Sequence, residues 1–313
     1  MRLRRFRPSD LPEFLQLLHG QFETEERVRG SNEPALRSLV ARTYRLDVRI
    51  VTTLARWIRR PVFDFWVAEE DRRLVGTTLV TYAARAGWIS SVAVHPEYRR
   101  RGYARSLVEQ AHASIRHGRR GYALLEVLAD NGAARALYEG MGYRPLRSST
   151  VLVREPGPLT VPPRATEGLR PFRKTDAPTL AQVADGHLTQ RERERQPASR
   201  EQFVLPPLIA QSTDSLADAW VIDRRNGPMA FVRATVGGIT RTANLTQPIV
   251  SHELAPEDAY ALVASAVEWV ESVRPLRMVT ELPDGRELAA GALARAGFQP
   301  AYRIDALACD LAP

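Results

Sequence analysis

Three consecutive arginines, Arg99 to Arg101, stand directly before Gly102, and this stretch of the sequence is the best suited to bind a ligand. The apolar residues that follow recur at helical spacing, which predicts a helix beginning near Gly102. The first backbone N–H groups of a helix have no partner within it, and the helix dipole adds positive potential there. The arrangement predicts an anion site that suits a pyrophosphate. Taken alone, an arginine run is more commonly a solvated surface or a nucleic-acid patch, and the spacing matches neither the Walker loop nor the dinucleotide fingerprint.

A carboxylate and a phenol lie downstream, at positions where burial decides what they can do. Glu126 interrupts the apolar strand YALLEVL, and alternation puts it on the same face as Leu124 and Leu128. Burial would raise the pKa of this carboxyl toward neutrality, which suits a general base. The alternative is a carboxylate at the end of the strand that pairs with a nearby arginine. Tyr138 lies on the apolar face of the next predicted helix, where a tyrosine is more commonly a core residue than a catalyst.

Alternating and helical apolar patterns predict the elements that position these residues. In the first half we expect strands at 3–6, 64–69, 74–82, 88–94, 122–128 and 148–154, and helices at 10–19, 33–60, 102–117 and 132–140. This order predicts an α/β (α+β) fold in which a mixed central sheet is flanked by helices.

The chain divides at a proline-rich stretch, and its two halves resemble each other. The sequence EPGPLTVPPRATEG predicts a linker over 156–168, between domains at 1–155 and 169–313. The opening residues 3–17 match residues 169–183 at a constant offset of 166, and in both copies a strand leads to a candidate N-cap, Ser9 or Thr175. LYEGMGYRP and ALARAGFQP, near the ends of the two halves, also match. A duplicated domain is therefore expected.

Composition narrows the class of protein further. The 313 residues are 44% hydrophobic and 26% charged, no apolar stretch is long enough to span a bilayer, and the start does not resemble a secretory signal, so we expect a cytoplasmic globular protein. Residues 1–155 carry 27 arginines against 17 acidic residues, whereas residues 156–313 carry 17 basic against 19 acidic residues. The basic first half suits nucleic acid or a small polyanion. Cys309 is the only cysteine and the histidines are scattered, so we expect no metal site.

Two segments resemble the signatures of one family, the Gcn5-related N-acetyltransferases (GNAT). VAVHPEYRRRGYA, residues 92–104, is similar to the acetyl-CoA loop of that family. LEVLADNGAARALYEGMGY, residues 125–143, resembles its second signature, with Asn131, Tyr138 and Tyr143 in register. The resemblance covers about the first 155 residues and implies two tandem GNAT-like domains in this chain.

The resemblance also implies a reaction, in which an acetyl group passes from acetyl-CoA to a primary amine by direct attack in a ternary complex. It implies Glu126 as general base, directly or through a water, and Tyr138 as the general acid that protonates the leaving thiolate. Backbone N–H groups near Ala93 and Val94 would polarise the acetyl carbonyl, and Asn131 would hydrogen-bond the pantetheine arm. The implied acetyl-CoA-binding residues are Val92, Ala93, Val94, Arg99, Arg100, Arg101, Gly102, Tyr103, Ala104, Arg105, Asn131 and Tyr138. Many family members carry an acid on the preceding strand, where this chain has Ser90 and Ser91.

The second half departs from both signatures. Residues 246–260, TQPIVSHELAPEDAY, lack the arginine–glycine loop, and Glu257 and Asp258 near the predicted helix start would repel a pyrophosphate. Arg286 and Leu293 replace the asparagine and the tyrosine of the second signature. We therefore interpret this half as a degenerate copy that has lost CoA binding.

Two other classes of function stay open from the sequence: a non-catalytic acyl-CoA-binding regulator, and a nucleic-acid-binding protein that uses the basic first half. The sequence does not distinguish a small amine, a peptide N-terminus and a lysine as acceptor. A small molecule is favoured because the second half would narrow the acceptor groove. We expect a monomer, since a duplicated chain can satisfy the pairing that single-domain relatives achieve by dimerising.

Overall fold

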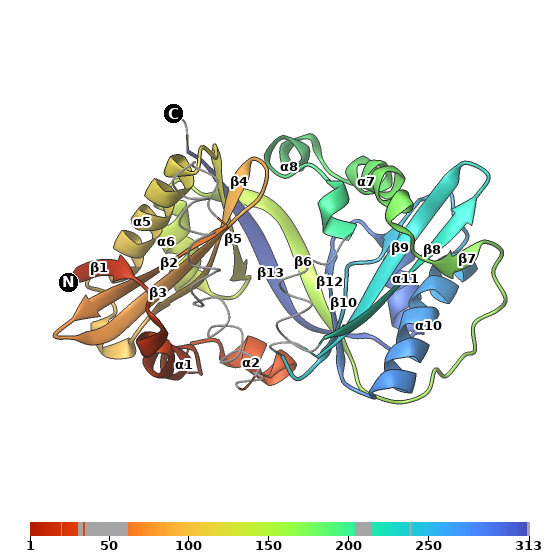
Figure 1. Cartoon of the computed structure of the whole chain (residues 1–313), viewed down its shortest axis with the longest axis horizontal. Helices are drawn as coiled ribbons and strands as arrows, with labels where there is room; N and C mark the ends of the chain where they lie inside the picture. The colour runs from red at the N-terminus through yellow and green to blue at the C-terminus, as the bar shows by residue number, and fades with distance from the viewer. Residues whose placement is uncertain (20, 31–33, 35–61, 204–214, 238–239, 312–313) are drawn as a thin grey trace. The chain divides into compact units, whose positions relative to one another are not determined.

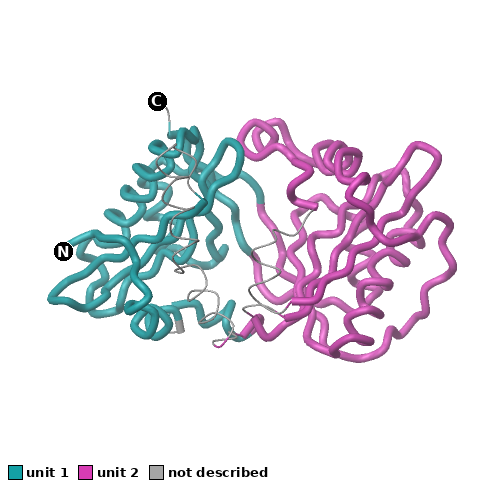
Figure 2. The backbone as a smooth tube through the Cα atoms, in the orientation of Figure 1, with its two compact units in different colours: residues 1–27, 37–147, 304–313 teal, residues 28–36, 148–303 magenta. Residues whose placement is uncertain are grey.

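Two compact units make up the part of the chain that the structure describes. The structure is a computed structural model, and it describes residues 1–19, 21–30, 34, 62–203, 215–237 and 240–311. Unit 1 comprises residues 1–27, 37–147 and 304–313, and unit 2 comprises residues 28–36 and 148–303 (Figure 2). The helix expected over 33–60 lies outside the described residues, apart from residue 34.

Unit 1 is built on a mixed sheet (Figure 1). In spatial order its strands are β1 (Arg2–Arg5), β2 (Phe63–Glu70), β3 (Arg73–Tyr82), β4 (Ala86–Val94), β5 (Tyr122–Leu128) and the last part of β13 (Gln299–Asp310). The helices in this part of the chain are α1 (Leu11–His19), α2 (Glu23–Arg29), α5 (Tyr103–His117) and α6 (Gly132–Glu139). β4 and β5 run parallel, and the other neighbouring pairs are antiparallel.

Helices cover both faces of this sheet, as two successive residues of β2 demonstrate. The ring of Phe65 packs against Phe14 of α1, with 5.0 Å between the centroids. The indole of Trp66 donates a hydrogen bond to the hydroxyl of Ser114 on α5 (2.9 Å). Because successive side chains of a strand point to opposite faces, α1 and α5 lie on opposite faces of the sheet.

Unit 2 has the same plan. Its sheet contains, in spatial order, β6 (Arg144–Arg154), β12 (Met278–Pro283), β10 (Ala243–Leu245), β9 (Gly227–Val236), β8 (Leu216–Arg224) and β7 (Leu169–Pro171), with β11 (Ile249–Val250) paired to β9. Its helices are α7 (Ala177–Gly186), α8 (Gln190–Arg195), α10 (Pro256–Val273) and α11 (Glu287–Arg295). The predicted mixed sheet flanked by helices is confirmed in both units.

The two units do not divide the chain at the predicted linker, because two strands are exchanged. Residues 304–310 of β13 pair with β5 of unit 1, from Ile304 opposite Leu128 to Asp310 opposite Tyr122. Residues 149–154 of β6 pair with β12 of unit 2. Each sheet is therefore completed by a strand from the other half of the sequence, a pairing that no local pattern can reveal.

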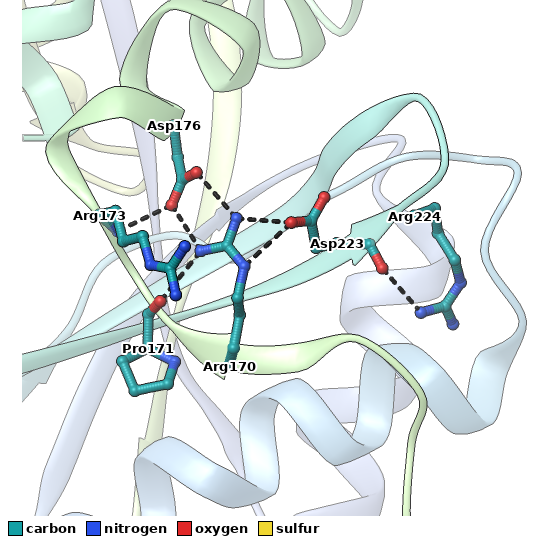
Figure 3. Close-up of polar contacts among 6 residues, drawn as sticks. All are labelled: Arg170, Pro171, Arg173, Asp176, Asp223 and Arg224. Atoms are coloured by element: carbon teal, nitrogen blue, oxygen red, sulfur yellow. Dashed lines mark hydrogen bonds and ion pairs between the residues drawn. The ribbon is translucent and has the colours of Figure 1, made fainter.

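One side-chain cluster of unit 2 joins the first strand, the first helix and a hairpin (Figure 3). The guanidinium of Arg170 donates two hydrogen bonds to the carboxylate of Asp176 (2.9 and 2.8 Å) and two more to Asp223 (2.9 and 2.7 Å). Asp176 also accepts the backbone N–H of Arg173 (2.7 Å). Ion pairing with Arg170 is the largest of the contributions that lower the pKa of Asp176.

Unit 1 contains the same cluster, 166 residues earlier. Arg4 donates to both carboxylate oxygens of Asp10 (2.7 and 2.9 Å) and to Glu69 (2.6 Å), and Asp10 accepts the backbone N–H of Arg7 (2.7 Å). Arg4 pairs with Val67 in the sheet, and Glu69 follows two residues later. In the same way Arg170 pairs with Val221, and Asp223 follows two residues later. The sequence repeat is thus reproduced in three dimensions down to individual hydrogen bonds.

These clusters correct the predicted caps of the first helix in each half. Ser9 and Thr175 do not cap these helices. A 3-10 turn precedes each helix, so that Asp10 and Asp176 are the residues placed to accept the backbone N–H three positions earlier. Each carboxylate is held in this position by its arginine partner. The hydroxyl of Ser9 or Thr175 would form a weaker hydrogen bond to an arginine, because it carries no charge.

Candidate active site

The predicted anion site lies at the start of α5. Gly102 precedes the helix in the left-handed conformation (φ +82°), which a glycine adopts without strain. A Cβ atom at this position would have no neighbour within 4 Å, so the space above the helix start is open. Ser106 donates to the carbonyl of Gly102 (3.0 Å), which puts the N–H groups of Tyr103, Ala104 and Arg105 ahead of the first helical hydrogen bond.

The arginine run surrounds this helix start, and its members differ in what they contact. Arg99 donates to the side-chain oxygen of Gln21, just after α1 (2.6 Å), and to the carbonyl of Val94 (3.4 Å). Arg101 lies over the ring of Tyr98, 5.2 Å from its centroid. All three arginines are exposed, so their charge is available to an anion at the open N–H groups.

β4 and β5 separate on the way to this site. Their parallel pairing runs from Ala86 opposite Tyr122 to Ile89 opposite Leu125 and ends there. Beyond this point β4 has a bulge against β3, where Ser91 has a φ of +52° and its carbonyl accepts the hydroxyl of Thr77 (2.8 Å). Segments 90–94 and 126–128 do not pair with each other, and we call them the β4–β5 seam.

A backbone donor of β4 faces the seam. The N–H of His95 donates to Val75 on β3 (2.8 Å). Successive residues of a strand direct their backbone groups to opposite neighbours, so the N–H of Val94 points away from β3, toward the side where β5 no longer pairs. The backbone donor that the resemblance implies near Ala93 and Val94 would be this N–H, and its role stays a prediction.

Glu126 is the first residue of β5 in the seam, and its predicted burial is wrong. The side chain is exposed, and one carboxylate oxygen lies 3.7 Å from Arg147. Solvent reaches it because pairing with β4 ends one residue earlier, at Leu125. The alternative environment, a strand-end carboxylate near an arginine, is the one found.

Tyr138 lies on the other face of the sheet, in the core between α6 and the strands. It is 6% exposed and packs in one cluster with Val127 and Val92, which belong to the two sides of the seam. Burial raises the pKa of the phenol to about 12, so it is protonated at neutral pH. Tyr138 and Glu126 therefore lie on opposite faces of the sheet, with the seam between them.

A buried hydrogen bond lies next to Tyr138, between Tyr143 and His112, and the sequence did not predict it. Tyr143 packs against Tyr138 with 5.7 Å between ring centroids, and its hydroxyl lies 2.7 Å from Nε2 of His112 on α5. Burial lowers the pKa of His112 to about 4, with a further contribution from Arg116, and burial raises the pKa of Tyr143. The position of His112 on the apolar face of α5 could have indicated a buried histidine that needs a hydrogen-bond partner.

Asn131 caps α6, since its side-chain oxygen accepts the N–H of Ala134 (3.1 Å). The asparagine is exposed, and its amide nitrogen is the end that is not used by the cap. The role implied for Asn131, a hydrogen bond to the pantetheine arm, would therefore use that nitrogen.

The corresponding helix start in unit 2 has different chemistry. α10 begins at Pro256, which has no N–H, and Glu257 and Asp258 occupy its first turn. Asp258 accepts a hydrogen bond from Arg224 (2.8 Å). At the start of α11, Arg286 donates to the carbonyl of His187 (2.7 Å), in the position that corresponds to Asn131.

The described residues contain neither a metal-binding cluster nor a membrane-spanning helix. None of their His, Cys, Asp and Glu side chains form a group of three or more that could hold a metal ion. None of their helices has both the length and the apolar character needed to cross a membrane.

Part of this chain matches a protein-family model, and the whole chain resembles solved structures. Residues 61–145 match the family model of the acetyltransferase (GNAT) domain. A tandem GNAT protein from the clavulanic acid biosynthesis pathway superposes with a TM-score of 0.67 at 17% identity, covering 100% of this chain and 99% of that one. A GCN5-related N-acetyltransferase from Sphaerobacter thermophilus gives a TM-score of 0.65 at 16% identity, with 100% and 96% covered. Residues 61–145 therefore match the GNAT acetyltransferase domain in sequence, and the chain as a whole has the fold of a tandem GNAT protein.

Proposed function

We propose that unit 1 transfers an acetyl group from acetyl-CoA to a primary amine. One observation carries the proposal: the β4–β5 seam opens on the way to a helix start whose N–H groups and arginines suit a pyrophosphate. An extended cosubstrate bound along the seam would reach from this anion site to Val92 and Val127, beside Tyr138. The family match over residues 61–145 supports the same assignment.

The amine would arrive from the face that carries Glu126 and α1. Its nitrogen forms a bond to the acetyl carbon, and its proton passes to Glu126 through a water, a route that suits an exposed carboxylate. The N–H of Val94 donates to the carbonyl oxygen as negative charge develops there. As the carbon–sulfur bond breaks, Tyr138 protonates the thiolate from the opposite face.

Tyr138→Phe tests this assignment, with Tyr122→Phe at the far end of β5 as the matched control. We expect kcat to fall by about a hundredfold to ten-thousandfold while the Kd for acetyl-CoA, measured by calorimetry, stays unchanged. Gly102→Glu should remove acetyl-CoA binding, because it puts bulk and negative charge into the open space above α5. Full turnover in Tyr138→Phe, or full affinity in Gly102→Glu, would contradict the roles given to these residues.

We further propose that unit 2 binds no CoA, because the acidic start of α10 replaces the open glycine start. Calorimetric titration of the whole chain should then give one acetyl-CoA site, whereas two sites would refute the degenerate assignment. The expectations of a small-molecule acceptor, a monomer and a cytoplasmic location stay predictions. Light scattering of the purified chain checks the monomer.

A second candidate, a non-catalytic acyl-CoA-binding regulator, is favoured by one observation: the carboxylate implied as base is exposed and lies beside Arg147. An assay of a broad panel of amines distinguishes the two. Tight acetyl-CoA binding without acetylation of any amine would favour the regulator.

A further inference from the structure

The strand that the second half of the sequence contributes to unit 1 packs against the helix that carries Tyr138. Residues 304–310 of β13 pair with β5, and Asp305 lies opposite Val127 in this pairing. Because side chains alternate along a strand, Asp305 and Leu307 point to the same face of the sheet. Leu307 packs in one buried cluster with Tyr138 and Val127, so this is the face on which α6 lies.

An ion pair joins β13 to α6 on this face. The guanidinium of Arg135 donates a hydrogen bond to the carboxylate of Asp305, whose side chain is only 13% exposed. Hydrogen bonds between ionised groups are strong contacts where water reaches them poorly. Arg135 precedes Tyr138 by three residues on α6, and residues at that spacing lie on the same side of a helix. The ion pair therefore holds the part of α6 from which the phenol projects.

α6 depends on such contacts for its position. It has 8 residues, and a helix of this length is not stable without tertiary packing. On one side the ring of Tyr138 packs against Tyr143, whose hydroxyl is hydrogen-bonded to His112 of α5. On the other side Arg135 binds Asp305 of β13. The helix is thus held between α5 and the exchanged strand.

Unit 2 lacks both the tyrosine and the ion pair. Leu293 of α11 corresponds to Tyr138. In the same alignment the arginine corresponds to Ala290 of α11 and the aspartate to Thr150 of β6, which cannot form an ion pair. One copy has the phenol together with the ion pair and the other has neither, although both units have the same fold. This distribution links the ion pair to the tyrosine rather than to the shared fold.

We propose that Asp305, acting through Arg135, is a positioning residue for Tyr138. The second half of the chain then serves acetyl transfer by supplying the strand that holds α6, although it has lost the CoA-binding signatures itself. The inference rests on the proposed function, in which Tyr138 protonates the leaving thiolate. Asp305 touches neither acetyl-CoA nor the amine. It keeps the phenol hydroxyl in line with the sulfur, where a misplacement of about 1 Å can cost about a hundredfold in rate.

A double-mutant cycle of Asp305→Asn and Tyr138→Phe in the full chain tests this role, with acetyl-CoA and the best acceptor from the amine panel. We expect Asp305→Asn to lower kcat by about tenfold and to leave the KM for acetyl-CoA unchanged. In the Tyr138→Phe background it should have no further effect on kcat, because the group that it positions is gone. Asp284→Asn is the matched control. It removes the ion pair with Arg303 of β13 (2.7 Å), outside the part of β13 that pairs with β5, and should leave kcat unchanged.

Two further variants keep the test independent of folding, which circular dichroism monitors in every protein of the series. Arg135→Gln, at the more exposed partner, should give the same cycle as Asp305→Asn. Exchanging the charges, with Arg135→Asp and Asp305→Arg together, should restore most of the kcat that Asp305→Arg alone loses.

The outcomes separate this inference from the proposed function. Unchanged kcat in Asp305→Asn, or an equal loss in the wild-type and Tyr138→Phe backgrounds, would overturn the positioning role and leave the acetyl transfer standing. Wild-type turnover in Tyr138→Phe, or no transfer to any amine, would refute the proposed function and the inference together.

Discussion

Protonation of His112 should destabilise the protein, and its burial sets the size of the effect. The residue is 8% exposed, and burial lowers its pKa from 6.5 to about 4. Because the unfolded chain binds this proton more readily than the folded one, the stability contribution is fully present above pH 6.5 and is lost as the pH falls toward 4. With these two pKa values the loss is about 2 kcal/mol at pH 5 and about 3 kcal/mol below pH 4.

Urea unfolding at pH 7.5 and pH 5.0 measures this loss, in the wild type and in two variants. His112→Gln has no group that titrates in this range, so about 2 kcal/mol of the pH-dependent loss should disappear. Tyr143→Phe keeps the buried imidazole and should lose about 1 kcal/mol at both pH values, with the pH dependence intact. Other groups, such as the half-buried His187 whose pKa is also lowered, contribute to all three proteins alike. The reasoning is refuted if His112→Gln and the wild type show the same pH dependence.

Three further predictions concern parts of the fold that can be perturbed singly. Gly102→Ala should cost about 1 kcal/mol in urea unfolding, because its φ of +82° is strained for any residue with a Cβ; no change in stability would contradict the left-handed conformation. Arg4→Met and Arg170→Met should each cost about 3 kcal/mol, since each leaves a buried aspartate without its partner, and clearly unequal losses would argue against equivalent clusters. The thiol of Cys309 is buried, and burial raises its pKa, so Ellman's reagent at pH 8 should react slowly with the folded protein and fast in urea; fast reaction of the folded protein would show that the end of β13 opens.

The elements around the candidate site follow from short-range patterns. The strand predicted at 122–128 is β5 residue for residue, and the helix predicted from 102 to 117 differs from α5 by one residue. These segments have strong periodicity and clear breakers, Pro96 and Gly102, so local sequence determines them. The open helix start at Gly102 was predictable for the same reason.

The environments of individual side chains were not predictable, because they depend on where distant segments meet. The exposure of Glu126 follows from the residue at which β4 and β5 stop pairing, which alternation along one strand does not encode. The hydrogen bond between His112 and Tyr143 joins α5 to the residue before β6, 31 positions further along the chain. Tertiary contacts determine the environment of each of these side chains, and the periodicity of the sequence does not predict those contacts.

The strand exchange has a consequence for how the chain folds during its synthesis. β5 leaves the ribosome about 180 residues before its partner in β13, a delay on the order of ten to forty seconds at ordinary translation rates. During that interval one edge of β5 exposes unpaired backbone groups, a surface to which other strands readily add. β6 occupies the same place in the first repeat as β13 in the second and is made earlier, so it competes for this edge. To reach the native fold, the nascent chain must therefore leave this edge of β5 free of β6 until β13 has been made. The order in which the strands are synthesised thus limits the folding yield.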